Sequence, residues 1–283
     1  MSGHRRYPGS SSFQDEELDR LLFWGREQEK GALFHLILAE SLVLFYAKSG
    51  CGKTSLLNAG VFQQLRDKEY YPILIRLNDL DRDPVRSIMD QVLAHESRGI
   101  EIERHGDGYD HLWRFFSGLR LWRGNVLLTP VIVFDQFEEL FTINSEARRQ
   151  RFLEQFSDLT RRQLPETAGP EEAADASVRS PAPKVVLSMR EDYLGEVEHV
   201  AAHVPRVMAH RFRLTPLTRE QAQEAIRRPA ELHDERISGR KFSYTPDAIK
   251  ELLDFLCTQR QRGKLVTGDE IEPFQLQILC RHI

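Results

Sequence analysis

The residues with the clearest chemical signature form the stretch Ala47-Lys-Ser-Gly-Cys-Gly-Lys-Thr54. Its glycines let the backbone turn so that successive N–H groups point inward, and such a loop before a helix binds phosphate oxygens. The spacing is that of the Walker A motif, with Ala47 at the first glycine position. In this motif Lys53 reaches the β and γ phosphates, and the Thr54 hydroxyl binds magnesium. We expect the nucleotide contacts to come from Ser49, Gly50, Cys51, Gly52, Lys53, Thr54 and Ser55.

A second group of candidate residues follows the apolar run 131–134. A carboxylate at the end of such a strand is the Walker B arrangement, so Asp135 is the expected magnesium partner. Hydrolysis also needs a group that orients or deprotonates water, and Glu138 or Glu139 lies about one turn further on. Glu138 is the first choice. Both glutamates could instead simply solvate the start of a helix, where the dipole favours acidic residues.

The elements that must position these residues can be read from the apolar pattern. Short apolar runs predict strands at 41–47, 71–77, 126–134, 184–189 and 211–214. Helical patterns lie between them at 54–65, 84–95, 109–122 and 147–164, and residues 15–39 predict two helices that meet at Trp24-Gly25. Strands that alternate with helices predict an α/β fold with a parallel sheet covered on both faces.

The same pattern predicts how the chain is organised. Residues 1–13 are expected to form an N-terminal tail, residues 14–216 a P-loop NTPase domain, and residues 217–283 a smaller helical lid without strands. Within the second of these, residues 165–183 are poor in apolar side chains and predict a mobile insertion. Because the last helical pattern has no C-cap, we expect that the lid is truncated and that a longer parent protein continues past it.

Composition excludes several classes of function. The 283 residues include 39 basic and 43 acidic ones, and this net charge of −4 gives no global attraction to nucleic acid or membranes. The basic pair Arg227-Arg228 has acids nearby and is expected to be ordinary surface. Three cysteines are too few for a disulfide framework, and no apolar signal segment is present, so we expect a cytoplasmic protein. His199 and His203 lack the pattern that completes a zinc helix.

Taken in order, the motifs resemble those of the STAND class of signalling NTPases, and most closely its bacterial novel-STAND branch. The segments that carry the resemblance are Tyr7-Pro-Gly9 with Phe13, Phe23-Trp-Gly-Arg-Glu27, Asp135-Gln-Phe-Glu-Glu-Leu-Phe141, Leu187-Ser-Met-Arg-Glu-Asp-Tyr193 and Leu214-Thr-Pro-Leu-Thr218. The departures are Ala47 at a glycine position, Trp24 at a position that is commonly phenylalanine, and the interruption by Ser10 to Ser12.

The resemblance implies further roles for particular residues. Gly25 and Arg26 would lie near the adenine and ribose, and Arg190 at a strand end would sense the γ-phosphate. A surface ion pair with Glu191 or Asp192 is the alternative for Arg190. Pro229 would pack near the base as the corresponding lid proline does in related NTPases, although a simple helix stop explains it equally well.

The function implied is an ATP-binding and slowly hydrolysing switch in signalling or bacterial defence. Its ATP or ADP state, with magnesium, would control closure of the lid and self-association on activation. Sensor or effector domains would belong to the longer parent chain, with no membrane and no nucleic acid as partner. Two alternatives stay open: a nucleic-acid-stimulated AAA+-like ATPase, and a nucleotide-dependent scaffold that does not hydrolyse. The sequence leaves the choice between ATP and GTP open.

Overall fold

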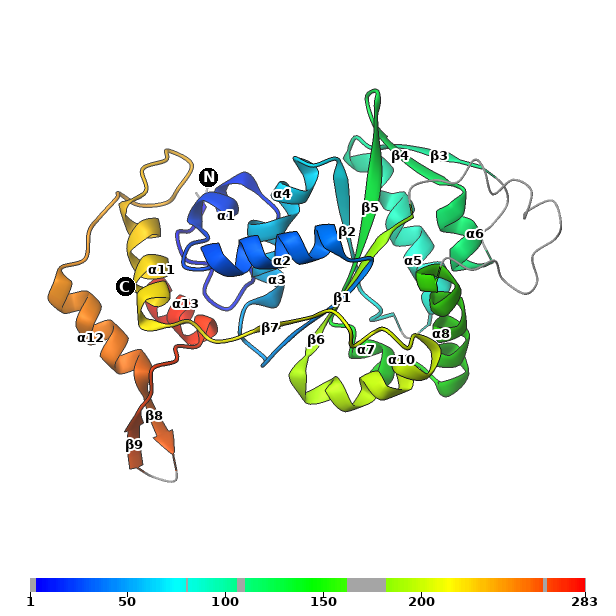
Figure 1. Ribbon diagram of the computed structural model, residues 1–283. Coiled ribbons are helices and arrows are strands. Elements are labelled where there is room, and N and C mark those ends of the chain that lie inside the picture. The colour runs from blue at the N-terminus through cyan, green and yellow to red at the C-terminus, as the bar shows by residue number, and fades with distance from the viewer. Residues whose placement is uncertain (1–3, 80, 106–109, 162–181, 262–263, 283) are drawn as a thin grey trace. The chain divides into compact units, whose positions relative to one another are not determined.

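A computed structural model describes residues 4–79, 81–105, 110–161, 182–261 and 264–282 (Figure 1). The chain divides into two compact units. The first unit comprises Met1–Leu33, Ala47–Gln63 and Leu214–Ile283, and the second comprises Phe34–Tyr46 and Gln64–Arg213. The glycine-rich loop therefore shares a unit with both ends of the chain, and the acidic strand end belongs to the other unit.

The second unit is built on a seven-stranded sheet. Its strands are β1 (Leu42–Ala47), β2 (Tyr70–Ile75), β3 (Glu101–Arg104), β4 (Leu119–Arg123), β5 (Val126–Asp135), β6 (Lys184–Arg190) and β7 (Arg211–Leu214). The order is β3-β4-β5-β6-β1-β7, and β2 also pairs with β5. This is possible because β5 is long: it pairs with β4 at its first residues and with β2 from Thr129 onward.

Parallel pairing explains why the central strands are continuous apolar runs. β2 and β6 both run parallel to β5, with Ile73 opposite Ile132 and Val133 opposite Val186. Strands of a sheet covered on both faces are buried on both faces, so their sequences do not alternate. The expected parallel α/β fold is confirmed, and β3 and β4 extend it as an antiparallel pair.

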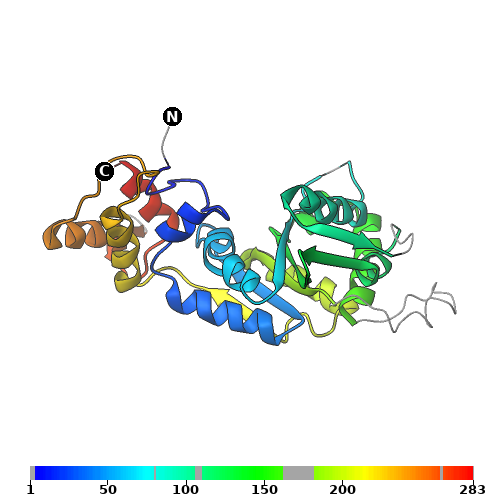
Figure 2. The same ribbon diagram turned by 90° about the horizontal axis from the view of Figure 1, so that it is seen from above.

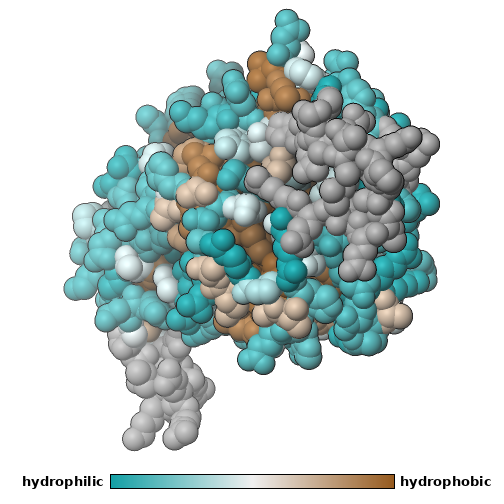
Figure 3. Space-filling view, turned by 45° about the vertical axis from the view of Figure 1, so that its right-hand side comes forward, coloured by the Kyte–Doolittle hydropathy of each residue, from teal (hydrophilic) through white to brown (hydrophobic). Residues whose placement is uncertain are grey.

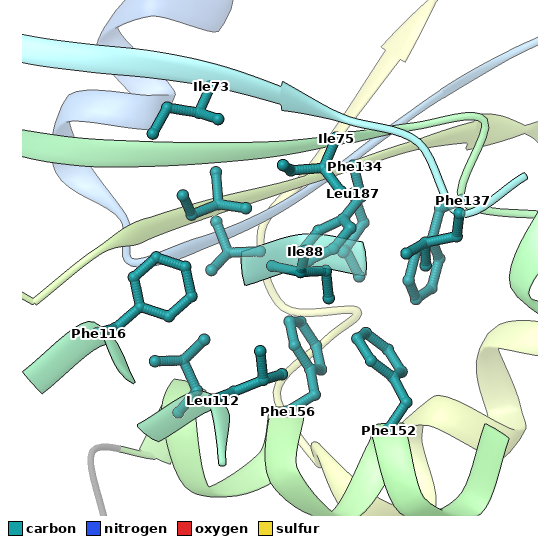
Figure 4. Packing of buried hydrophobic residues seen from close by; sticks show 14 of the residues in the cluster. Ile73, Ile75, Ile88, Leu112, Phe116, Phe134, Phe137, Phe152, Phe156 and Leu187 are labelled. Atoms are coloured by element: carbon teal, nitrogen blue, oxygen red, sulfur yellow. The ribbon is translucent and has the colours of Figure 1, made fainter. Parts of the chain in front are cut away.

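Helices cover this sheet and complete its core. They are α5 (Pro84–Leu93), η2 (Ala94–Arg98), α6 (Leu112–Ser117), α7 (Glu139–Ile143), α8 (Glu146–Arg161), η4 (Glu191–Glu196) and α10 (Val197–His203). Phe134 and Phe137 from the strand end pack against Phe152 and Phe156 of α8, as Figure 4 shows. In Figure 2 the green strands and helices of this unit are seen from above.

The first unit is mainly helical. Its helices are α1 (Glu17–Leu22), the first part of α2 (Glu27–Ala39), α3 (Lys53–Ser55), the π-helix η1 (Leu56–Val61), the start of α4 (Phe62–Arg66), α11 (Arg219–Glu231), α12 (Pro246–Cys257) and α13 (Pro273–His282). Thr218 forms the capping box with Gln221 that fixes the start of α11. A core of Tyr7, Ile226, Leu253 and Leu276 joins the N-terminal segment to these helices.

Several predicted elements differ from the structure. The predicted helix 109–122 is wrong, because α6 ends at Ser117 and β4 begins at Leu119. Gly118 lies between them, where a side chain would clash with the carbonyl oxygen of His105. The expectation that strands stop beyond Leu217 is also wrong, because β8 (Thr258–Gln261) and β9 (Lys264–Thr267) form an antiparallel hairpin.

The predicted tail and insertion have different outcomes. Residues 4–13 are not a free tail: Arg6, Tyr7 and Phe13 are buried, and the hydroxyl of Tyr7 donates to the Ile226 carbonyl oxygen at 2.5 Å. The predicted insertion 165–183 lies outside the described residues except for its last two. The predicted boundary between residues 216 and 217 stays a prediction.

Candidate functional site

The glycine-rich loop leaves β1 and leads directly into α3. Gly50 and Gly52 have φ angles of 79° and 88°, a left-handed conformation that residues with side chains rarely adopt. Gly52 is the N-cap of α3, and its carbonyl oxygen accepts a hydrogen bond from Leu56 N at 2.9 Å. Lys48, Ser49 and Gly50 are exposed. The loop therefore presents backbone to solvent at a helix start, the arrangement that binds phosphate.

The N-terminal segment holds the helix that follows this loop. Phe13 N donates to the Ser55 hydroxyl at 3.1 Å, and the Asn58 side chain donates to the Phe13 carbonyl oxygen at 3.0 Å. Ser55 and Asn58 are both buried. Ser55 was expected to contact nucleotide, and in the structure its hydroxyl binds the N-terminal segment at Phe13. Cys51 is also buried, at 2% exposure, so it is a packed loop residue.

Arg26 connects the loop to the start of the C-terminal helices. Its guanidinium donates to the carbonyl oxygens of Cys51 (3.3 Å) and Thr215 (2.9 Å) and pairs with Glu29 at 2.8 Å. Glu29 in turn accepts from the Gln221 amide of α11 at 2.9 Å. Only 3% of Arg26 is exposed. This side chain is committed to protein partners, and the predicted contact with adenine and ribose stays a prediction.

Gly25 and Pro229 also belong to the first unit. Gly25 has a φ angle of 84°, and a side chain there would clash with the Gln221 carbonyl oxygen, so α11 packs directly on this turn. Pro229 is not a helix stop, because α11 continues to Glu231. It is buried, and its carbonyl oxygen accepts from the buried Arg6 at 2.8 Å. Its predicted place near the base stays a prediction.

The acidic strand end in the second unit is built around Asp135. Asp135 is the last residue of β5 and is 1% exposed. Its Oδ2 accepts from Nη2 of Arg76 at 2.8 Å, and its Oδ1 accepts from the Ser188 hydroxyl at 3.3 Å. Arg76 directly follows β2 and Ser188 lies in β6, so three neighbouring strands contribute to this group. A buried carboxylate requires such partners.

A sharp turn after Asp135 places the two glutamates. Gln136 has a φ of 58°, and Phe137 N donates to the Ser188 carbonyl oxygen at 2.9 Å. Glu138 is buried, and its Oε2 accepts from Arg190 N at 3.2 Å. Glu139 begins α7, and its buried Oε2 has no hydrogen-bond partner among the described residues.

The electrostatic setting separates the two glutamates. Burial raises the pKa of the Glu139 carboxyl above 4.5, and the nearby charges of Glu138 and Asp135 raise it further, while Arg76 opposes the rise. A carboxylate with a raised pKa and a free oxygen is suited to accept a proton from water. Glu138 was the first choice from sequence, and the choice between the two glutamates stays a prediction.

Arg190 ends β6 and forms a local ion pair. Its guanidinium pairs with Asp192, which raises the pKa of Arg190 above its ordinary value, and it lies 5.6 Å from the centre of the Tyr193 ring. The ion pair is the alternative that sequence left open. Its Nε has no hydrogen-bond partner among the described residues. The predicted role as γ-phosphate sensor stays a prediction.

The remaining candidates are set aside by their surroundings. On α10 His199 is exposed and His203 is half-buried, and no group of three or more metal-ligating side chains occurs in the described part of the chain. Arg227 and Arg228 both pair with Glu224, at 2.9 and 2.6 Å, so one carboxylate is shared by two guanidinium groups. The face in Figure 3 is mostly hydrophilic, with apolar side chains in small areas.

Each unit thus gathers its own part of the predicted site. The first contains Gly25, Arg26, residues 49–55 and Pro229, and the second contains Asp135, Glu138, Glu139 and Arg190. Sequence reasoning missed Arg76 and Ser188. The signal for Arg76 was available, because it is the one charged residue within the apolar run 71–77.

The second group suits magnesium. Mg²⁺ takes oxygen ligands and is usually held by one or two carboxylates together with phosphates. The Asp135 carboxylate and the Ser188 hydroxyl beside it are oxygen ligands of this kind, so the chemistry of the residues fits.

Sheet topology and loop together define the class of protein: the chain is a P-loop NTPase with a mostly parallel sheet flanked by helices. No helix among the described residues is long and apolar enough to cross a membrane. Residues 7–258 match the family described as Novel STAND NTPase 1, and the chain belongs to this family. The predicted relationship to the novel-STAND branch is confirmed, and with it nucleotide binding by an NTPase.

Two examples illustrate the likeness of this chain to solved structures. The Walker-type ATPase PABY2304 of Pyrococcus abyssi is 15% identical to this chain, with a TM-score of 0.53. The match covers 95% of this chain and 69% of the Pyrococcus chain. Cdc6p from Pyrobaculum aerophilum is 16% identical, with a TM-score of 0.52, and the match covers 89% of this chain and 59% of the Cdc6p chain. At this identity the likeness shows the fold alone. No curated protein matches the chain significantly.

Proposed function

We propose that the chain is an ATP-dependent switch that binds ATP with Mg²⁺ and hydrolyses it slowly. The observation that carries the proposal is the backbone of the loop, where left-handed Gly50 and Gly52 lie between a buried strand and a helix start. This conformation favours glycine, and loops of this kind present main-chain N–H groups to phosphate oxygens. Membership of an NTPase family supports it.

In this proposal the first unit holds the nucleotide. Lys53 neutralises the β and γ phosphates, and Thr54 reaches the metal, as their places in the motif require. Ser49, Gly50, Cys51 and Gly52 supply backbone contacts, whereas Ser55 supports the loop through Phe13. Gly25 and Pro229 shape the surroundings of the base. Arg26 holds the loop through its hydrogen bond to the Cys51 carbonyl oxygen.

The second unit supplies the groups for hydrolysis. Bound Mg²⁺ would stabilise the negative charge that develops on the phosphates. Asp135 is the carboxylate that would hold it. Glu139 accepts a proton from the attacking water, Glu138 keeps the turn in place through Arg190 N, and the Arg190 guanidinium responds to the γ-phosphate. The free oxygen of Glu139 supports this division of roles.

The switch itself would act through residues 217–283, the lid. Only contacts that differ between nucleotide states can shift a conformational equilibrium, and the loop and α11 share the contacts of Arg26. We propose that ATP closes the lid and promotes self-association, and that hydrolysis reverses both. Sensor or effector domains of a longer chain would read the state, in the cytoplasm, in signalling or bacterial defence.

Phosphate release from ATP tests the hydrolytic part. We expect slow turnover in the wild type and loss of most of it in Glu139→Gln, by about 10²- to 10⁴-fold, the range for a general base. Gln150→Glu, at an exposed position of α8, serves as a surface control and should leave turnover unchanged. No turnover in the wild type, with nucleotide binding intact, would support the scaffold instead.

A nucleic-acid-stimulated ATPase is the other alternative. Arg227 and Arg228 both pair with Glu224, which offsets part of the positive charge of this basic pair. Addition of single- and double-stranded DNA or RNA to the same phosphate-release assay decides the question. We expect no stimulation, and a severalfold increase would favour the alternative.

A further inference from the structure

Arg76 is placed where it affects the metal site although no motif contains it. Its backbone is fixed by α5, because Gln91 accepts from Arg76 N at 3.0 Å and donates to its carbonyl oxygen at 2.9 Å. Gln91 is itself held by Ser87 at 3.0 Å. The main chain of Arg76 is therefore anchored, and its direction relative to Asp135 is set by the fold.

The side chain of Arg76 is less constrained than its backbone. It is 38% exposed, whereas its partner Asp135 is 1% exposed. Its Nε is buried and has no hydrogen-bond partner among the described residues. The guanidinium thus makes an ion pair with Asp135 but keeps an unused donor, so the pair is not a fully satisfied structural unit.

The pair occupies the carboxylate that a metal needs. Arg76 takes Oδ2 of Asp135, and the Ser188 hydroxyl takes Oδ1 at 3.3 Å. A guanidinium and a divalent cation repel each other at close range, so both cannot use the same carboxylate oxygen. Of the two partners, Arg76 is the charged and more exposed one, and it can turn away without moving the sheet.

We infer that Arg76 is a positioning residue that serves as the counter-cation of Asp135 in the absence of metal and competes with Mg²⁺ for it. Its displacement sets the Mg²⁺ concentration at which the nucleotide complex forms. The inference rests on the proposed function, since it assigns a regulator to the same Asp135. If Arg76 competes with the metal, its removal should strengthen metal binding. Removal of a purely structural ion pair would not have this effect.

The test is the Mg²⁺ dependence of binding of a fluorescent ATP analogue to the full chain, measured by anisotropy. In Arg76→Gln the Mg²⁺ midpoint should fall by about tenfold, within the range typical of coupled binding events. Arg76→Lys keeps the charge and should restore most of the wild-type midpoint. Arg82→Gln is the matched control, because Arg82 pairs with exposed Asp79 and Asp90, and its midpoint should equal that of the wild type.

A midpoint that rises or stays unchanged in folded Arg76→Gln overturns the inference. If the wild type binds no nucleotide at any Mg²⁺ concentration, the proposed function fails instead, so the two failures differ. A measurement on the wild type covers the case in which the variant does not fold. Modification of arginines by phenylglyoxal, read by peptide mass spectrometry, should be faster at Arg76 with Mg²⁺ and ADP than with ADP and EDTA. Equal rates at Arg76 contradict the inference, and Arg82 is the internal control.

Discussion

Replacement of Arg26 by alanine tests whether this residue organises the first unit or reads the nucleotide. The change removes hydrogen bonds to the carbonyl oxygens of Cys51 and Thr215 and the ion pair with Glu29. The side chains of Arg26 and Glu29 are only 4% and 16% exposed, so Glu29 is left largely buried without its cation. The hydrogen bond that Glu29 accepts from the Gln221 amide remains in the variant.

The magnitude follows from these contacts. Removal of one partner of a buried ion pair costs about 3–5 kcal/mol, because an uncompensated charge stays behind. Because Glu29 is partly exposed, we expect a loss at the lower end of this range, about 3 kcal/mol. Arg26→Lys keeps the charge but cannot contact both carbonyl oxygens with a planar fork, so it should lose less stability than the alanine variant.

Hydrogen exchange measured without nucleotide is the appropriate assay, because it reports each segment separately. We expect faster exchange in residues 47–55 and 215–231 of Arg26→Ala, with β5 and β6 unchanged as an internal control. Unchanged exchange in both segments, combined with a large loss of ATP affinity, would refute the reasoning. Arg26 would then act as the base-contacting residue that the family resemblance implies.

Further predictions address single positions in both units. Gly25→Ala should lose about 1–3 kcal/mol of unfolding free energy from its clash with the Gln221 carbonyl oxygen and its φ of 84°. The control is Gly31→Ala in α2, where a side chain would meet open space, and it should gain up to about 1 kcal/mol. Urea unfolding measures both variants, and a Gly25→Ala variant as stable as Gly31→Ala would contradict this prediction. Thr218→Ala should cost about 1 kcal/mol by loss of the capping box, and an unchanged unfolding midpoint would argue against that cap. Since Glu139 must be ionised to act as a base and its pKa is raised, turnover should fall on acidification at a pH above 4.5, and full activity at pH 4.5 would exclude the role.

Raised pKa values also fix the sign of one stability effect. The Glu139 carboxyl has a higher pKa in the folded chain than in the unfolded chain, so the folded state binds the proton more tightly. The contribution of Glu139 to stability is therefore greatest below the unfolded pKa and is lost as the pH rises through the folded pKa. At neutral pH, where Glu139 is ionised, the chain therefore lacks this stabilisation. A carboxyl with a perturbed pKa that is kept despite the lost stability is consistent with a catalytic role.

Features carried by contiguous residues could be predicted from sequence. The phosphate loop needs two glycines, a lysine and a hydroxyl at fixed spacing, and in the structure Gly50 and Gly52 have left-handed backbones, which allow the turn. The strand that ends at Asp135 was equally visible, because a buried parallel strand is an uninterrupted apolar run. Membership of the novel-STAND family rests on the order of several such short segments.

Features that depend on distant residues could not be predicted. The ion pair of Arg76 with Asp135 joins positions 59 residues apart, and Arg26 reaches Thr215 over 189 residues. The helical pattern of 109–122 hid β4, because pairing with β3 and β5 outweighs the local preference of these residues. Pro229 suggested a helix end from local sterics alone, whereas tertiary contacts with Arg6 accompany a helix that continues beyond it.

Binding of ATP measured by titration calorimetry, on the wild type and on Lys53→Ala, tests the central claim most directly. Lys48→Ala is the control, because Lys48 is an exposed lysine of the same loop outside the phosphate-binding positions of the motif. We predict one tight site in the wild type and in Lys48→Ala, and loss of binding by at least about tenfold in Lys53→Ala, as expected when a charged contact to phosphate is removed. Equal affinity of all three proteins would contradict the account, because the loop would then not be where the phosphates bind.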